Sequence, residues 1–202
     1  MGRFVRSRGM MLTPVTADES AYLAADEAVD HAHPLVRETA ARLLTGVDGD
    51  LAAYARAAYE FVRDTVPHSA DVGDWRLPWR ASDVLAQGVG ICHTKSHALV
   101  ALLRAEGVPA GFCYQKLDVL HGLIALRLPG SARWVRQDPR GNKPGVQARF
   151  SLGREQLGYA VRPLKGECDY PVLYAGPHPV VLRALREAED RAHLWRLLDV
   201  AL

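Results

Sequence analysis

One cysteine in this chain of 202 residues stands where a thiol can become a nucleophile. Cys92 follows the glycine-rich turn 88–90 and begins the segment 92–106, in which apolar residues recur at helical spacing. The first turn of a helix has unpaired backbone N–H groups and the positive end of the helix dipole, and both lower the pKa of a thiol. Cys92 is therefore a candidate nucleophile, although a cysteine can also serve as a small buried apolar side chain.

A nucleophilic thiol needs a base, and the base needs an acceptor that fixes its orientation. His121 begins one strand-like segment, and Asp138 directly follows another. A turn at Pro129–Ser131 lies between them, with about eight residues on either side. A hairpin closed by this turn brings His121 and Asp138 to the same end of an antiparallel pair. Each residue alone has an ordinary structural explanation, but together with Cys92 they form a candidate Cys–His–Asp set.

The elements that must position these residues predict an α+β fold. Helical spacing of apolar residues predicts helices over 34–45, 51–66, 84–87, 92–106 and, broken, over 180–198. Aromatic and β-branched residues predict strands over 109–116, 121–128 and 133–137. The segment 68–80 reads as a long loop, and the proline-rich segment 139–178 as irregular chain laid over the core. Helices thus precede an antiparallel sheet, with the helix of Cys92 packed on it.

Composition restricts the classes of function. Hydrophobic residues make up 49% and charged residues 24%, as in ordinary folded proteins. Twenty-five Lys and Arg against 23 Asp and Glu give a net charge of +2 without a cluster of like charge, so a nucleic-acid partner is not expected. Three cysteines are too few and too widely spaced for a disulfide framework, and no apolar stretch approaches the length of a membrane span. We therefore expect a cytoplasmic protein without a membrane partner.

Three motifs resemble those of the transglutaminase-like superfamily. Residues 88–92 read GVGIC, residues 102–110 read LLRAEGVPA, and WVRQDP occupies 134–139 after the His121 segment. In that family a Gly-x-Gly-x-Cys turn leads into the nucleophile helix, and an Asp-Pro pair ends a later strand. The resemblance covers roughly residues 50–145. It implies a papain-like core in which N-terminal helices and the nucleophile helix pack on an antiparallel sheet.

The resemblance also implies a role for each residue of the set. Cys92 would be the nucleophile, His121 the general base and acid, and Asp138 the group that fixes the His121 tautomer. The thiolate would attack an amide or ester carbonyl, and water or an amine would resolve the thioester. The Cys92 backbone N–H would be one oxyanion donor, and the second would be a side chain upstream of the cysteine. The candidates for this second donor, or for the cleft wall, are Gln87, Trp75, Trp79 and His68.

The resemblance thus implies a thiol-dependent hydrolase or acyltransferase, such as a protease, deamidase or transglutaminase. We expect hydrolysis by water rather than transfer to an amine. Its partner would be a peptide, a protein or a small amide, and no cofactor is expected. It would form one domain over residues 1–202, with a core at about 50–145, an N-terminal helical extension and a proline-rich C-terminal extension.

Two alternatives remain open at this point. One is a peptide-binding module that keeps the fold without catalysis. The other is a zinc site on Cys92, His93 and His97, which lacks further ligands at recognisable spacing and is disfavoured. The residues after Asp138, namely Arg140, Asn142 and Lys143, either line the substrate channel or form a solvated loop.

Overall fold

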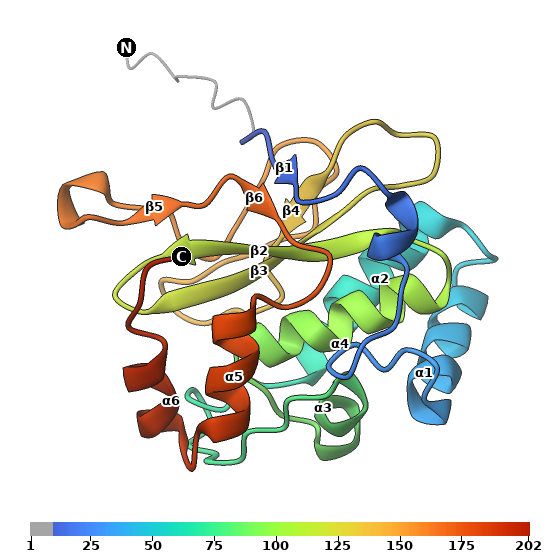
Figure 1. Ribbon diagram of the computed structural model, residues 1–202. Helices are drawn as coiled ribbons and strands as arrows, with labels where there is room; N and C mark the ends of the chain where they lie inside the picture. The colour runs from blue at the N-terminus through green and yellow to red at the C-terminus, as the bar shows by residue number, and fades with distance from the viewer. Residues whose placement is uncertain (1–9) are drawn as a thin grey trace.

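The computed structural model describes residues 10–202, which form an α+β fold. The six α-helices of this part of the chain gather on one face of a four-stranded antiparallel sheet (Figure 1). The N-terminal strand and much of the proline-rich segment cover the opposite face (Figure 1). The expected fold class is confirmed.

The central sheet has the strand order β4–β3–β2–β5. Strands β2 (Ala110–Lys116) and β3 (Leu120–Leu126) form its long antiparallel hairpin, and β4 (Val135–Gln137) extends it beside β3. All residues of β3 are buried, which fits a strand covered on both faces. Because β3 begins at Leu120, the His121 side chain belongs to the end of the sheet next to the β2–β3 turn.

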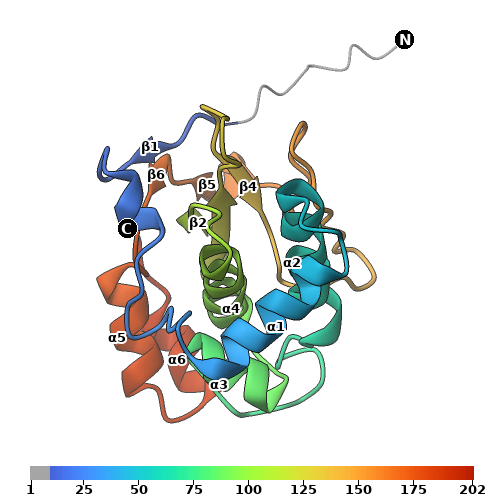
Figure 2. The ribbon, with the colours of Figure 1, turned by 90° about the vertical axis from the view of Figure 1, so that its right-hand side faces the viewer.

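Helix α4 (Cys92–Ala105) lies at the centre of the molecule. Every residue from His93 to Ala105 is buried, as expected for a helix surrounded by other elements. Figure 2 looks along α4 and shows helices on both sides of it, with the sheet above. Helices α1 (Pro34–Thr45) and α2 (Leu51–Thr65) lie on one side, and α5 (Pro179–Glu187) and α6 (Arg191–Leu197) on the other. The position of Cys92 is therefore fixed by packing around its whole helix.

The predicted elements agree with the observed ones except in two places. Helix α3 (Ala81–Gln87) begins earlier than predicted, and its first turn is bound from outside the helix, since the Ser82 N–H and hydroxyl donate to the Asp30 carboxylate. The segment 139–178, expected to be irregular, contributes two short strands, β5 (Cys168–Asp169) and β6 (Val172–Leu173). Strand β5 pairs with β2, and β6 pairs in parallel with β1 (Thr13–Pro14).

Within residues 10–202, no helix combines the length and the apolar character needed to cross a membrane.

Candidate active site

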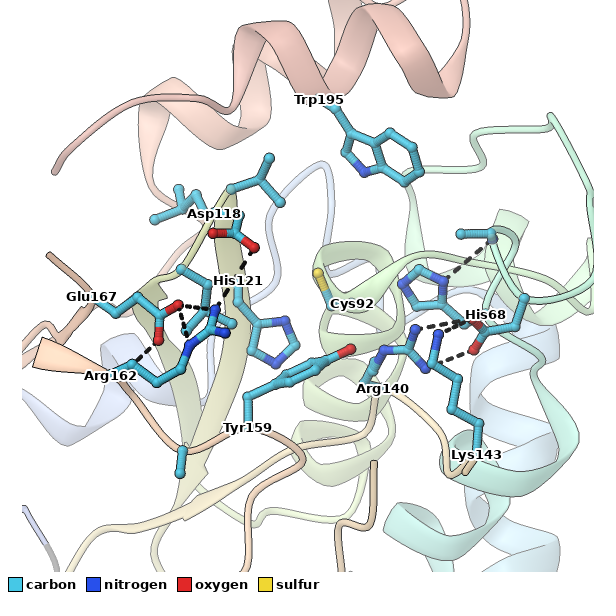
Figure 3. A pocket seen from close by; sticks show the side chains of 16 residues that line it. His68, Cys92, Asp118, His121, Arg140, Lys143, Tyr159, Arg162, Glu167 and Trp195 are labelled. Carbon is cyan, nitrogen blue, oxygen red and sulfur yellow. Dashed lines mark hydrogen bonds and ion pairs between the residues drawn. The ribbon is translucent and has the colours of Figure 1, made fainter. Parts of the chain in front are cut away.

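A cavity of about 490 Å³ opens beside the N-terminal end of α4. Six separate parts of the chain build it, and Figure 3 shows the Cys92 sulfur between the His68 and His121 rings. The lining consists of His68, Ala70, Asp71, Cys92, Leu117, Asp118, Val119, Leu120, His121, Arg140, Lys143, Tyr159, Ala160, Arg162, Glu167 and Trp195. Cys92 and His121 therefore both line the cavity, together with His68, one of the four candidate oxyanion donors.

Cys92 is the first residue of α4, and its side chain is only partly exposed. The residue before it, Ile91, has its N–H bound by the Thr94 hydroxyl at 3.1 Å, which closes the first turn of the helix. Gly90 makes this close turn possible, since a Cβ there would lie 2.7 Å from the Thr94 oxygen. The glycine-rich turn thus brings the thiol to a helix N-terminus, as the sequence predicts.

His121 and Asp138 lie in direct contact. His121 Nε2 is 3.0 Å from Asp138 Oδ2, so that Nδ1 is the ring nitrogen left for the thiol. The Asp138 carboxylate is buried and accepts two further hydrogen bonds, from the Gly158 N–H at 3.0 Å and the Arg140 N–H at 3.1 Å. A Cβ on Gly158 would lie 2.9 Å from Oδ2, so a glycine is required for this approach. The carboxylate is thereby fixed on several sides.

The charges of this group reinforce one another. Burial raises the pKa of the Cys92 thiol, but the nearby His93 and His121 rings and hydrogen bonds to His121 and His68 bring it well below its usual value. Burial also opposes protonation of His121, yet the Asp138 carboxylate and the Cys92 sulfur raise its pKa to about 10. The pKa of Asp138 is lowered against the effect of burial, chiefly by the charge and hydrogen bond of His121. These shifts all favour a thiolate, an imidazolium and a carboxylate.

His68 faces the sulfur from the side opposite His121 (Figure 3). Its Nδ1 accepts the Ala70 N–H at 3.3 Å, so the neutral ring carries its proton on Nε2. Burial lowers the pKa of His68, although its hydrogen bond with Cys92 acts in the opposite direction. His68 is therefore a neutral N–H donor beside the nucleophile at pH 7.

The other three candidate donors do not line the cavity. Gln87 is exposed at the end of α3, and the exposed Trp75 ring stacks on the Arg191 guanidinium at 4.7 Å. The Trp79 carbonyl binds His97 Nδ1 at 2.6 Å, and its ring lies beside Arg186. The two tryptophans therefore belong to the packing of the 68–80 loop, and Gln87 faces away from the site.

The two histidines considered as zinc ligands are bound to backbone carbonyls. His97 contacts Trp79 as described, and His93 Nε2 lies 3.0 Å from the Leu120 carbonyl, immediately before His121. Gly122 makes room for the His93 ring, because a Cβ there would lie 2.5 Å from Nδ1. His93 thereby connects α4, which begins at Cys92, to β3, which carries His121. In the part of the chain that the structure describes, no group of three His, Cys, Asp or Glu residues is arranged to hold a metal ion.

Several cavity residues come from segments in which the sequence carries no motif. Tyr159 packs edge-on against the His121 ring, with centroids 5.1 Å apart, and Trp195 reaches the cavity from α6. From the sequence, Arg140 and Lys143 could either line a substrate channel or lie in a solvated loop. In the structure both line the cavity, and both bind the Asp71 carboxylate. Asn142 does not line it; its side-chain oxygen accepts the Ala148 N–H at 2.7 Å instead.

Comparison with known proteins identifies the family of the chain. The family model described as the transglutaminase-like superfamily matches residues 37–139, slightly more than half of the chain. The chain belongs to this superfamily. The matched range begins in α1 and ends directly after Asp138, so it includes His68, Cys92, His121 and Asp138.

A solved structure adds evidence for the superfamily fold. The crystal structure of a "putative cysteine protease" from Cytophaga hutchinsonii superposes with a TM-score of 0.52 and 18% sequence identity. The match covers 62% of this chain and 43% of that protein, so this chain corresponds to less than half of its length. No curated protein matches the chain significantly.

Proposed function

We propose that this protein is a thiol-dependent hydrolase or acyltransferase that acts on an amide or ester carbonyl through Cys92, His121 and Asp138. The observation that carries the proposal is a partly exposed thiol at a helix N-terminus, within a cavity, beside a histidine bound to a buried carboxylate. A structural cysteine has no need of these partners, because a buried thiol is stable as the neutral form.

The reaction proceeds in two halves. The Cys92 thiolate attacks the carbonyl carbon, and the tetrahedral intermediate collapses as His121 donates its proton to the departing amine. The product is a thioester on Cys92 and a neutral His121. His121 then takes a proton from water or an amine, which attacks the thioester carbonyl, and Cys92 leaves as the thiolate, so that the starting thiolate and protonated His121 are restored. Asp138 binds Nε2 throughout, so that Nδ1 is the nitrogen that exchanges the proton.

His68 is the second oxyanion donor in this proposal, beside the backbone N–H of Cys92. A neutral N–H group stabilises the developing negative charge on the substrate oxygen and takes no proton from the nucleophile. His68 meets this requirement because its Nε2 carries the proton and burial keeps the ring neutral. Of the four candidates, it alone lines the cavity with Cys92.

The acyl donor in this proposal is a peptide or protein amide. The cavity is flanked by charged groups on both sides, with Arg140 and Lys143 near His68, and Asp118 and Glu167 near the β2–β3 turn (Figure 3). Leu117, Val119 and Trp195 add apolar surface to the lining, so the cavity offers contacts both for the polar backbone and for an apolar side chain of a peptide. The structural similarity to a protein described as a cysteine protease is consistent with this choice. We also propose a cytoplasmic setting, in which the three free cysteines would stay reduced.

Active-site labelling tests the proposed function. Purified protein is treated at pH 6 with one equivalent of iodoacetamide and, separately, with p-nitrophenyl acetate, and mass spectrometry locates the modification. We expect rapid alkylation of Cys92 and an acetyl thioester on the same residue, both lost in Cys92→Ala and retained in the matched variant Cys113→Ala. Adding a primary amine then distinguishes transfer from hydrolysis by the product formed. A Cys92 thiol that reacts no faster than an ordinary cysteine would exclude the enzyme and favour the binding module.

A further inference from the structure

The nucleophile helix carries a buried lysine that the proposed chemistry does not use. Lys95 lies one turn after Cys92, and its side chain is 0% exposed. Lysine is almost never fully buried unless its amine is paired, since removing the ammonium from water is costly. No carboxylate forms an ion pair with Lys95 among the described residues. The reason for its presence must therefore lie in other contacts.

The Lys95 amine binds the end of helix α2. Its Nζ donates to the Val66 carbonyl at 2.5 Å and to the Arg63 carbonyl at 3.2 Å. These carbonyls belong to the last turn and the C-cap of α2, where the helix leaves its acceptors without partners and where its dipole is negative. Lys95 thus fixes the point at which the chain leaves α2 and turns towards His68.

The chain between Val66 and Ser69 is bound on its other side to the approach of Cys92. The Gly90 N–H donates to the Pro67 carbonyl at 3.2 Å, and the Ser69 N–H donates to the Gly90 carbonyl at 2.9 Å. We call residues 66–69 the donor turn. It is held by two residues that lie on either side of Cys92 in the sequence, Gly90 before it and Lys95 after it. His68 is the residue of this turn that projects into the cavity.

The Lys95 amine also lies against the turn that follows Asp138. A Cβ on Gly141, whose φ is +107°, would come within 3.3 Å of Nζ. Burial lowers the pKa of Lys95 to about 7, and Arg140 acts in the same direction while Asp138 acts against it. Both protonation states keep at least two N–H groups, so both carbonyl contacts are available on either side of neutrality.

We propose that Lys95 is a positioning residue that holds the donor turn, and hence His68 Nε2, at the location where the substrate oxyanion forms. The inference rests on the proposed thiol chemistry and adds a residue that touches neither substrate nor nucleophile. A donor displaced by about 1 Å can cost about 10²-fold in rate, which is the scale on which such a residue acts.

A comparison of two reactions at Cys92 tests this role. Attack on p-nitrophenyl acetate passes through an oxyanion, whereas alkylation by iodoacetamide displaces iodide and forms none. Lys95→Met keeps the length of the buried stem but removes the donors. We expect it to slow acylation about 10- to 100-fold and to leave the alkylation rate within about twofold of wild type. Lys165→Met, on an exposed turn, is the matched control and keeps both rates.

A double-mutant cycle with His68→Ala decides whether Lys95 acts through His68. In the His68→Ala background, Lys95→Met should cause no further loss of acylation. A full additional loss there, equal loss of acylation and alkylation, or unchanged acylation in Lys95→Met would each overturn the role. If Lys95→Met does not fold, the same cycle with Lys95→Gln, which keeps an NH₂ donor on a shorter stem, gives the answer. Failure of the proposed function is recognised separately, because wild type itself then shows neither rapid alkylation nor an acetyl thioester.

Discussion

Cys92 and Cys113 lie on adjacent elements, α4 and β2, yet their thiols have opposite properties. Cys113, in β2, is fully buried among apolar side chains, and burial raises the pKa of its thiol. Burial acts on Cys92 in the same direction, but the surrounding histidines reverse the result. The comparison shows that a thiol taken out of water becomes inert by default. A nucleophile requires charged and hydrogen-bonding partners that more than offset that effect.

The two regions also differ in how the chain builds them. The Cys113 region is apolar packing, in which Leu123 of β3 lies directly opposite the cysteine and Tyr22 and Leu173 complete the cluster. The Cys92 region needs a helix N-terminus, a strand end and two turns that are distant in sequence. The partners of Cys92 can therefore be removed one at a time, and each removal should make its environment more like that of Cys113.

The largest effect is expected from removing the Cys92 thiol itself. Cys92→Ala should lower turnover of an amide or ester substrate by about 10⁴-fold or more, since no other group near His121 can form the covalent intermediate. The matched variant Cys113→Ala should keep turnover within about twofold of wild type, because Cys113 does not line the cavity. Steady-state kinetics on both variants measures the contrast. Equal losses in the two variants would contradict the distinction between the regions.

Removing the charge of Asp138 should have the next largest effect. Asp138→Asn keeps the shape of the side chain but lets its amide donate towards His121, which favours the wrong tautomer. We expect kcat to fall about 10³- to 10⁴-fold. Without the carboxylate, the pKa of His121 should fall from about 10 and the thiol pKa should rise. The pH dependence of alkylation by iodoacetamide measures the second change, and an unaltered profile would exclude Asp138 as the source of the ion pair.

A smaller effect is expected from removing the His68 donor. His68→Ala should lower acylation by about 10²- to 10³-fold, the usual cost of one oxyanion donor. Alkylation by iodoacetamide should change little, because that reaction forms no oxyanion and His121, a larger influence than His68, still lowers the pKa of the thiol. Trp75→Phe is the matched control, since Trp75 lies on the same loop but outside the cavity. Parallel loss of both reactions in His68→Ala would assign His68 to the ionisation of the thiol instead.

The pH profile of wild type should show which residue controls each limb. Hydrolysis of an amide needs the Cys92 thiolate and the protonated His121 together. On the acid side, activity should be lost only well below the usual pKa of a thiol, when Cys92 gains a proton. On the alkaline side, activity should fall as pH rises through about 10, where His121 loses the proton needed by the leaving amine. About one pH unit above that point the rate should be reduced about tenfold, whereas alkylation of the thiolate should persist.

The sequence predicts the parts of this protein that depend on local pattern. Helix α4 was predicted over 92–106 because its apolar residues follow helical spacing, and its observed range is Cys92–Ala105. Strands β5 and β6 have two residues each, too few for any periodicity, and they form only through pairing with distant strands. Local sequence patterns therefore predict the helix that carries Cys92, but not the short strands of the segment 139–178.

The same division holds within the site. The turn at Pro129–Ser131 allowed His121 and Asp138 to be placed together from residue counting alone, and their side chains lie 3.0 Å apart. The choice among His68, Trp75, Trp79 and Gln87 could not be made, because it depends on the pairing of His68 with Gly90, 22 positions away in the sequence. Tyr159 follows no motif and reaches His121 only through the path of the tail.

The smallest effect on turnover is expected from a change at Cys113, the buried thiol of β2. Cys113→Ser replaces a buried thiol by a hydroxyl that needs a hydrogen-bond partner, in a strand where the backbone groups already bind β3. We expect the free energy of unfolding to fall by about 1–3 kcal/mol, the cost of burying an unpaired polar group. Turnover per folded molecule should be unchanged. Cys92→Ser should show the reverse, with turnover lost and stability nearly kept, because its side chain borders the cavity. Urea unfolding and kinetics on the two serine variants separate these outcomes, and a turnover loss in Cys113→Ser would show that the β2 core and the nucleophile are energetically coupled.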